Sequence, residues 1–198
     1  MKDLLKPNII VFLFLPFLAI FGTYQLNYLS SNHLLLLLIG IISIVPIFTT
    51  FGNRKKKYYP IVLWIISVSL LLHESLININ LALGDAQLEY FLANLVKLNG
   101  SWNPILPFSK NAMLRIVLLH PIYSIIGKIN LMLVFKIIHP LVLSFFPIAI
   151  YKIFNEYFSK KWSFLFSSYI MFSFLFFLTL NRTTRTGIAV FFVSLIVL

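Results

Sequence analysis

The sequence predicts an all-α protein, a multi-pass transmembrane helical bundle. Of its 198 residues, 60% are hydrophobic and 11% are charged, whereas about 25% of the residues in a soluble domain are charged. Several apolar runs also approach or exceed about 20 residues, the length that a helix needs to cross about 30 Å of hydrocarbon. Together these observations place the chain in a lipid bilayer.

The charges are strongly unequal. The chain has 16 Lys and Arg against 5 Asp and Glu, a net charge of +11, and it has no cysteine. In a membrane protein such an excess of cations usually lies in cytoplasmic loops that face anionic lipid. We therefore expect a multi-pass protein of the cytoplasmic membrane, with the bilayer and not nucleic acid as its partner.

Three membrane spans are expected in residues 1–83. The run from Asn8 to about Tyr28 is longer than a signal-peptide core and reads as a retained first span, and Leu34 to Phe51 reads as the second. The cations Arg54–Lys57 follow and mark the cytoplasmic side, so the third span, Pro60 to about Leu83, runs outward.

The third span contains the adjacent ionisable residues His73 and Glu74. Charged groups are costly at this depth in lipid. Two interpretations remain open: Glu74 is neutral and hydrogen-bonded within the bundle, or the pair belongs to a proton relay or lines a cavity.

Residues 84–130 are expected to form the first large outer loop, with two helices lying along the membrane surface. It opens with Asp85 and Glu89, two of only five acidic residues, just where apolar sequence gives way to polar sequence. Acids at the water boundary suit a site that works on a molecule arriving from outside, although Asp85 could also be an ordinary helix N-cap. The amphipathic stretch Ala86–Leu98 reads as the first surface helix.

The second surface-lying or re-entrant helix is expected at Ala112–Ile126, which contains Arg115 and the pair His120-Pro121. If this segment crossed the membrane, Lys160 and Lys161 would lie outside, against the cation bias. The segment is therefore not counted as a span.

Further transmembrane helices are expected in residues 131–198, at Leu131 to about Phe154 and at Trp162–Leu180. The final run, from Gly187 onward, is too short to span, so we expect the sequence to be the N-terminal fragment of a larger protein.

Two arginines, Arg182 and Arg185, fall in a short loop on the expected outer side, against the bias that places the other loops. A guanidinium offers a rigid fork of donors that suits phosphate. The pair could hold a lipid phosphate, or could be a headgroup clamp with no catalytic role.

The order of these parts resembles the GT-C superfamily of polyprenyl-phosphate-dependent glycosyltransferases, of the archaeal multi-pass type. The resemblance covers about half of the sequence, from Gly84 to Thr186. The matching parts are the acid after an outward span, the surface helix that ends near Leu98, the segment Leu119–Tyr123 and the two outer arginines. The chain departs from the pattern in having two additional spans at its start and no adjacent Asp-Glu pair.

The resemblance implies a membrane glycosyltransferase that moves a sugar from a polyprenyl-phosphate donor to an acceptor on the outer face of the cytoplasmic membrane. Asp85 would take the proton from an acceptor hydroxyl. The residues expected to bind substrate are Glu89, Tyr90, His120, Arg182 and Arg185. Metal dependence varies within this superfamily and stays open here: Asp85 and Glu89 could hold a divalent cation, Mg or Mn.

Two other classes of function compete with the transferase. A membrane transporter or lipid flippase would line a passage with Glu74, Asp85 and the arginines, although transporters more often gather their charges in a cavity at the membrane midplane. A scaffold subunit of a membrane complex would not need Asp85.

Overall fold

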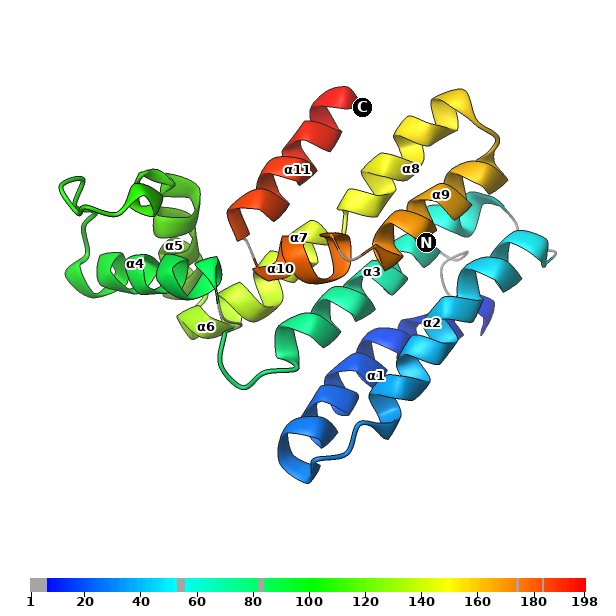
Figure 1. Cartoon of the computed structure of the whole chain (residues 1–198), viewed down its shortest axis with the longest axis horizontal. Coiled ribbons are helices and arrows are strands. Elements are labelled where there is room, and N and C mark those ends of the chain that lie inside the picture. Colours follow the sequence, from blue (N-terminus) through cyan, green and yellow to red (C-terminus); the bar gives the residue numbers. More distant parts are fainter. Residues whose placement is uncertain (1–6, 53–55, 82–83, 174, 183) are drawn as a thin grey trace.

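The computed structural model describes residues 7–52, 56–81, 84–173, 175–182 and 184–198. Within these ranges the chain is helical and has no β-strand (Figure 1), which confirms the all-α prediction. Arg54 and Lys55 of the predicted cation run, and the predicted end of the third span at Leu83, lie outside the described residues.

The first half of the chain contains α1 (Pro7–Leu29), α2 (His33–Phe51), η1 (Lys56–Tyr58), α3 (Tyr59–Leu76), α4 (Asp85–Asn99), η2 (Ser109–Ala112), η3 (Arg115–Leu119) and α5 (His120–Ile126). The second half contains α6 (Leu131–Leu133), η4 (Val134–Ile138), α7 (His139–Leu143), α8 (Phe146–Tyr157), α9 (Lys160–Phe172), η5 (Leu175–Thr179), α10 (Leu180–Arg182) and α11 (Thr184–Val197).

Four helical segments of the described ranges are long and apolar enough to cross a membrane: Phe12–Leu29, His33–Phe51, Lys56–Leu76 and Leu131–Tyr157. The last of these joins α6, η4, α7 and α8. Large apolar side chains on α1 and α2 point outward and are exposed, among them Phe14, Phe17, Phe21, Phe48 and Phe51. Such a surface suits acyl chains, so these helices associate with a lipid bilayer.

The main core lies around α3, which packs against α1, α7, α8 and α9. Leu63, Ile66 and Leu71 of α3 are fully buried there. At the start of α3, the ring of Tyr59 contacts Phe164 of α9, with 4.5 Å between ring centroids. The third span is therefore the most enclosed of the four, because other helices surround it rather than lipid.

The third span ends earlier than the sequence suggests. Helix α3 stops at Leu76, followed by an irregular loop at residues 77–81. The ammonium of Lys136, buried in η4, donates hydrogen bonds to the backbone oxygens of Asn78 (2.5 Å) and Ile79 (2.7 Å). These bonds hold the backbone of the loop that follows α3, so a distant residue stabilises the chain where the helix has ended.

The expected span Trp162–Leu180 is interrupted, which corrects that prediction. Helix α9 ends at Phe172, and Ser173 adopts an extended conformation with φ −69° and ψ 146°. The Ser173 hydroxyl donates to the Ile170 carbonyl and accepts from the Phe176 N–H, so it offers the backbone an alternative to the helical bonds. The segment resumes as η5 and α10.

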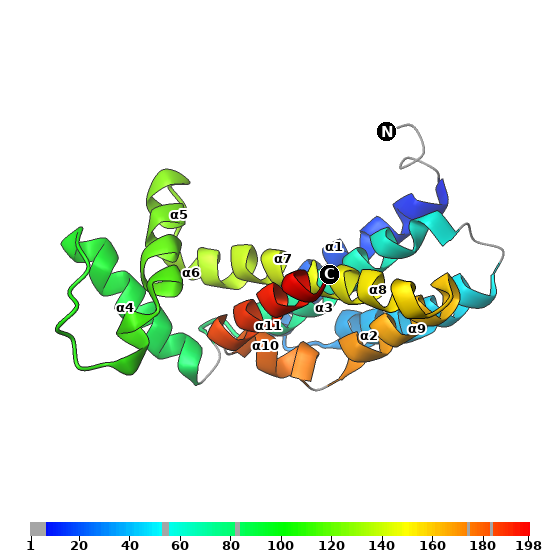
Figure 2. The same ribbon diagram turned by 90° about the horizontal axis from the view of Figure 1, so that it is seen from above.

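Helices α4 and α5 lie together at one end of the molecule, away from α1, α2, α8 and α9 (Figure 1). Figure 2 shows α5 standing crosswise to the row formed by α6, α7 and α8. A small core of Ala93, Ile116, Leu131 and Phe135 joins α4 and η3 to α6 and η4. Residues 115–126 form an apolar helical segment too short to count among the candidate spans.

Two of the helical segments contain a wide, π-helical turn immediately before a His-Pro pair. The turn η3 precedes His120-Pro121, and η4 precedes His139-Pro140. Proline has no N–H to donate and its ring collides with the carbonyl four residues earlier in a regular α-helix. A widened turn accommodates that carbonyl without ending the helix.

Candidate functional site

The candidate site begins at the first residue of α4. Gly84 is the N-cap, with φ 125°, a conformation that favours glycine, and no side chain caps the helix. Asp85 is thus not the N-cap. Its Oδ1 accepts from the Lys110 ammonium of η2, and its Oδ2 accepts from Nη2 of Arg185 on α11 at 2.8 Å. The structure brings together Asp85 and Arg185, both predicted site residues, and adds Lys110.

The two cations keep Asp85 ionised. The hydrogen bond from Lys110, with the charges of Lys110 and Arg185, lowers the pKa of the Asp85 carboxyl despite the opposing effect of partial burial. The Asp85 side chain is still 27% exposed. It is therefore an accessible carboxylate at neutral pH.

Glu89 lies one helical turn after Asp85, in a very different environment. It is 1% exposed, and within the described ranges neither carboxyl oxygen has a hydrogen-bond partner of normal geometry. Burial and, second, the charge of Asp85 raise the pKa of Glu89 to about 7, against the lowering effect of Lys110 and Arg185. At neutral pH this carboxyl is therefore about half protonated, which suits a group that exchanges protons.

The sequence suggested that Arg182 and Arg185 hold one phosphate together, but in the structure they bind different partners. The Nε of Arg182 donates to Oε1 of Glu74 at 2.8 Å, near the end of α3. Glu74 is 5% exposed. The sequence left open whether this buried acid has a hydrogen-bonding partner within the bundle, and in the structure Arg182 is that partner. The two arginines are thus bound to two different carboxylates.

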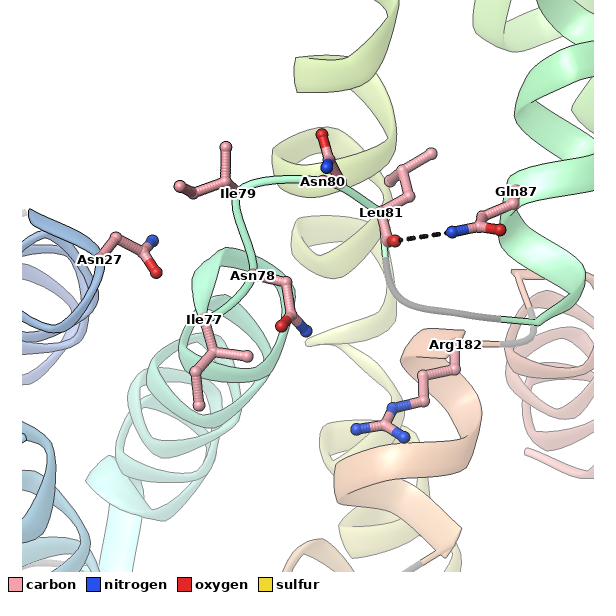
Figure 3. A pocket seen from close by; sticks show the side chains of 8 residues that line it. All are labelled: Asn27, Ile77, Asn78, Ile79, Asn80, Leu81, Gln87 and Arg182. Atoms are coloured by element: carbon pink, nitrogen blue, oxygen red, sulfur yellow. Dashed lines mark hydrogen bonds between the residues drawn. The ribbon is translucent and has the colours of Figure 1, made fainter. Parts of the chain in front are cut away.

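An open polar cleft of about 590 Å³ lies beside Arg182 (Figure 3). Its wall comes from the end of α1, the loop 77–81, the start of α4 and α10. In Figure 3 Arg182 points from α10 toward the end of α3, and Gln87 donates to the Leu81 carbonyl. The other polar side chains of the wall are the amides Asn27, Asn78 and Asn80.

Tyr90 and His120 lie apart from the charged cluster and meet at one aromatic ring. The ring of Phe135 in η4 contacts both, with centroid distances of 5.7 Å to Tyr90 and 4.3 Å to His120. His120 is 5% exposed, and burial lowers its pKa to about 4, so it is neutral at pH 7. Both residues pack against the small core rather than beside Asp85.

The arrangement around Asp85 does not fit a divalent cation. Both Asp85 oxygens already bind cationic side chains, and a metal there would lie against Lys110 and Arg185. The described residues contain no group of three or more His, Cys, Asp or Glu side chains that could hold a metal ion. We therefore derive no step through Mg or Mn.

Sequence reasoning missed Lys110, Lys136, Arg115 and His139. Lys110 carried one signal, since it is the only cation between Lys97 and Arg115 and lies in the same expected loop as the acids. The others sit in apolar runs that hydropathy alone assigns to membrane or interface.

Neither a protein-family model, a curated protein nor a solved structure matches the chain. The function is therefore argued from the geometry of the site.

Proposed function

We propose that the chain is a membrane glycosyltransferase of GT-C type, which moves a sugar from a polyprenyl-phosphate donor to an acceptor on the outer face of the cytoplasmic membrane. One observation carries the proposal. Outside the candidate spans, two carboxyl groups lie one helical turn apart with opposite protonation tendencies, Asp85 ionised and Glu89 near half-protonation. Such a divergence is typical of acid–base chemistry.

In the proposed reaction the acceptor hydroxyl binds at Asp85, the exposed carboxylate. Its proton passes to the carboxylate while its oxygen forms a bond to the anomeric carbon of the sugar. The bond between that carbon and the phosphate oxygen breaks, and its electron pair leaves with the polyprenyl phosphate. Glu89, buried beneath, responds to the charge of Asp85 and is a second carboxyl that can hold a proton.

The polar cleft suits a sugar. Its volume of about 590 Å³ lies in the range of small-molecule pockets, about 300–1,000 Å³. Amide side chains both donate and accept hydrogen bonds, as the hydroxyls of a sugar require. Gln87 places one edge of this cleft in the first turn of α4, the helix that begins at Asp85.

The test is sugar transfer by the purified protein in liposomes from a synthetic decaprenyl-phosphate sugar to acceptors in a membrane extract. Asp85→Asn keeps the size of the side chain but removes the base, so turnover should fall at least about a hundredfold. Glu156→Gln, which neutralises an exposed acid on α8, is the matched control and should transfer normally. Near-normal turnover by Asp85→Asn would remove this residue from the mechanism.

A transporter or lipid flippase is the second candidate, and the Glu74–Arg182 pair at the end of the third span favours it. Ionisable groups at membrane depth often mark a substrate path. The two functions separate in one liposome experiment with a fluorescent lipid. A flippase would move the lipid between leaflets without sugar transfer, and Glu74→Gln would slow that movement.

A further inference from the structure

A second, smaller pocket lies between η3 and α5 on one side and η4, α7 and α11 on the other. Its polar wall consists of Arg115, His120, Tyr123 and His139, and Ile188 of α11 is part of its apolar wall. None of these residues belongs to the charged cluster around Asp85. The pocket needs an explanation of its own.

Three polar atoms of this wall have no hydrogen bond of normal geometry in the part of the chain that the structure describes. They are Nη1 of Arg115, Nδ1 of His120 and Nε2 of His139. Backbone groups of Arg115 and Ile116 lie near His120, and that of Leu180 lies near His139. The two histidines are 5% and 3% exposed, and their ring centroids are 6.2 Å apart. A buried polar group without a partner destabilises the folded state. Nη1 of Arg115, which has no partner among the described residues, and the two imidazoles surround one small space, and this indicates a ligand that bonds to all three side chains.

The positive charge of Arg115 indicates that the ligand of this pocket is an anion. Arg182 and Arg185 each bind a carboxylate, but within the described ranges Arg115 has no acidic partner. Its guanidinium lies over the ring of Phe192, 4.5 Å from the centroid, which fixes its orientation. Burial lowers the pKa of Arg115, as expected of a cation that lacks a counter-charge.

The size of the pocket and its surroundings limit which anions it can bind. The free space at the inner end is about 30 Å³, enough for about two water molecules, so it admits one or two oxygens of a phosphate and not a whole sugar phosphate. On the segment that carries Arg115 and His120, Leu114, Ile122 and Ile126 are exposed, and the segment is too short to span. Such a surface suits the edge of the bilayer.

We propose that this pocket binds the phosphate group of an anionic lipid, with Arg115 as the cation and His120 and His139 as hydrogen-bonding partners of the phosphate oxygens. A guanidinium and two imidazoles approach from different elements, which matches the separate oxygens of a tetrahedral group. The lipid chain lies along the exposed apolar side chains of the same short segment.

The pocket is close enough to the charged cluster for both to serve one substrate. Arg185, Ile188 and Phe192 lie on one face of α11, at spacings of three and four residues. At about 1.5 Å per residue, Ile188 is about 4.5 Å and Phe192 about 10 Å along the axis from Arg185. The identity of the lipid as the sugar donor rests on the proposed function, whereas binding of a phosphate lipid does not.

Binding is measured on the purified protein in phosphatidylcholine nanodiscs, by native mass spectrometry with decaprenyl phosphate as the probe. Arg115→Gln should weaken binding by about 10- to 100-fold, the range for a hydrogen bond to a charged group, and Arg115→Lys should weaken it less. Lys161→Gln, which removes an exposed cation of α9, should bind normally. Unchanged binding by Arg115→Gln, or equal binding of the uncharged alcohol decaprenol, would overturn the proposal.

Further arms separate the alternatives. If inorganic phosphate binds the pocket as tightly as decaprenyl phosphate does, the ligand is free phosphate and the proposal of a lipid is overturned. Without phosphate lipid, Arg115→Gln should be as stable as the unaltered protein, since it removes an uncompensated cation; a destabilised variant would assign Arg115 a structural role instead. Loss of sugar transfer in Asp85→Asn tests the proposed function, whereas loss of decaprenyl phosphate binding in Arg115→Gln tests this pocket.

Discussion

The substitution Glu89→Gln should make the protein more stable in neutral and alkaline solution. Glu89 is 1% exposed, and its pKa is raised from an ordinary 4.5 to about 7. At about 1.4 kcal/mol per pKa unit, the buried carboxylate costs about 3 kcal/mol once it is fully ionised. Glutamine has nearly the same shape and never acquires the charge.

The sign of the pH dependence follows from the raised pKa. The folded state holds the Glu89 proton more tightly than the unfolded state, so the stability from this group is fully present below about pH 4.5 and is lost as the pH rises to about 7. Asp85, whose pKa is lowered, acts in the opposite direction and only at lower pH. The difference between wild type and Glu89→Gln isolates the effect of Glu89.

The assay is reversible unfolding in mixed micelles of dodecyl maltoside and SDS at about pH 5 and about pH 8. The free energy of unfolding of Glu89→Gln, relative to wild type, should increase by about 2–3 kcal/mol between the two conditions. The control Glu156→Gln should show no such change, because this acid is exposed. If Glu89→Gln shifts stability equally at both pH values, Glu89 titrates as an ordinary glutamate and the reasoning about its environment is wrong.

Three further predictions concern the fold. Gly187→Ala should destabilise the protein by about 1–3 kcal/mol, because its Cβ would lie 2.5 Å from a backbone oxygen, whereas Gly40→Ala meets open space and should be neutral or slightly stabilising in the same unfolding assay. Lys136→Met removes the cation at the end of α3, so amide hydrogen exchange at residues 77–81 should become faster; unchanged exchange would deny Lys136 that role. On intact cells, an impermeant maleimide should label a cysteine at Ser101 but not one at Lys160, and labelling at Lys160 would mean that residues 112–128 cross the membrane.

The helices themselves were largely predictable from the sequence. The second span was expected at Leu34–Phe51 and is found at His33–Phe51, and the amphipathic stretch Ala86–Leu98 is found as α4, Asp85–Asn99. Both depend on local signals, hydropathy and a helical period, that the chain carries within about 20 residues. Gly100 adds a local stop to α4, with φ 67°.

The ends and interruptions of helices were less predictable, because partners elsewhere in the chain set them. Nothing near Leu76 indicates that α3 ends there, since the ammonium that binds the loop carbonyls of Asn78 and Ile79 belongs to Lys136. The break at Ser173 involves one hydroxyl, although Ser163, Ser167 and Ser168 of the same segment lie within α9 without interrupting it. A hydropathy profile averages over about 20 residues, so it does not show a helix end or a break that depends on a single side chain.

The candidate site shows the same division. The sequence singled out Asp85, Glu89 and the two arginines by residue type and position. It could not show that Arg185 binds Asp85 across 100 residues while Arg182 binds Glu74 across 108, because pairing over such separations depends on how helices pack. Nor could it show that Asp85 and Glu89, so alike in sequence, differ in burial and therefore in protonation.

The wide turns η3 and η4 set the rotational phase of the histidines that follow them. An α-helix advances about 100° per residue, so a helix that carries an additional residue in one turn presents everything after it on a different face. Deleting a single residue from either turn would swing His120 or His139 by about 100°, off the pocket wall. Such a deletion would leave the hydropathy of the segment nearly unchanged. Two chains with the same apolar profile could therefore differ in whether they possess this pocket at all, according to the number of residues in one turn.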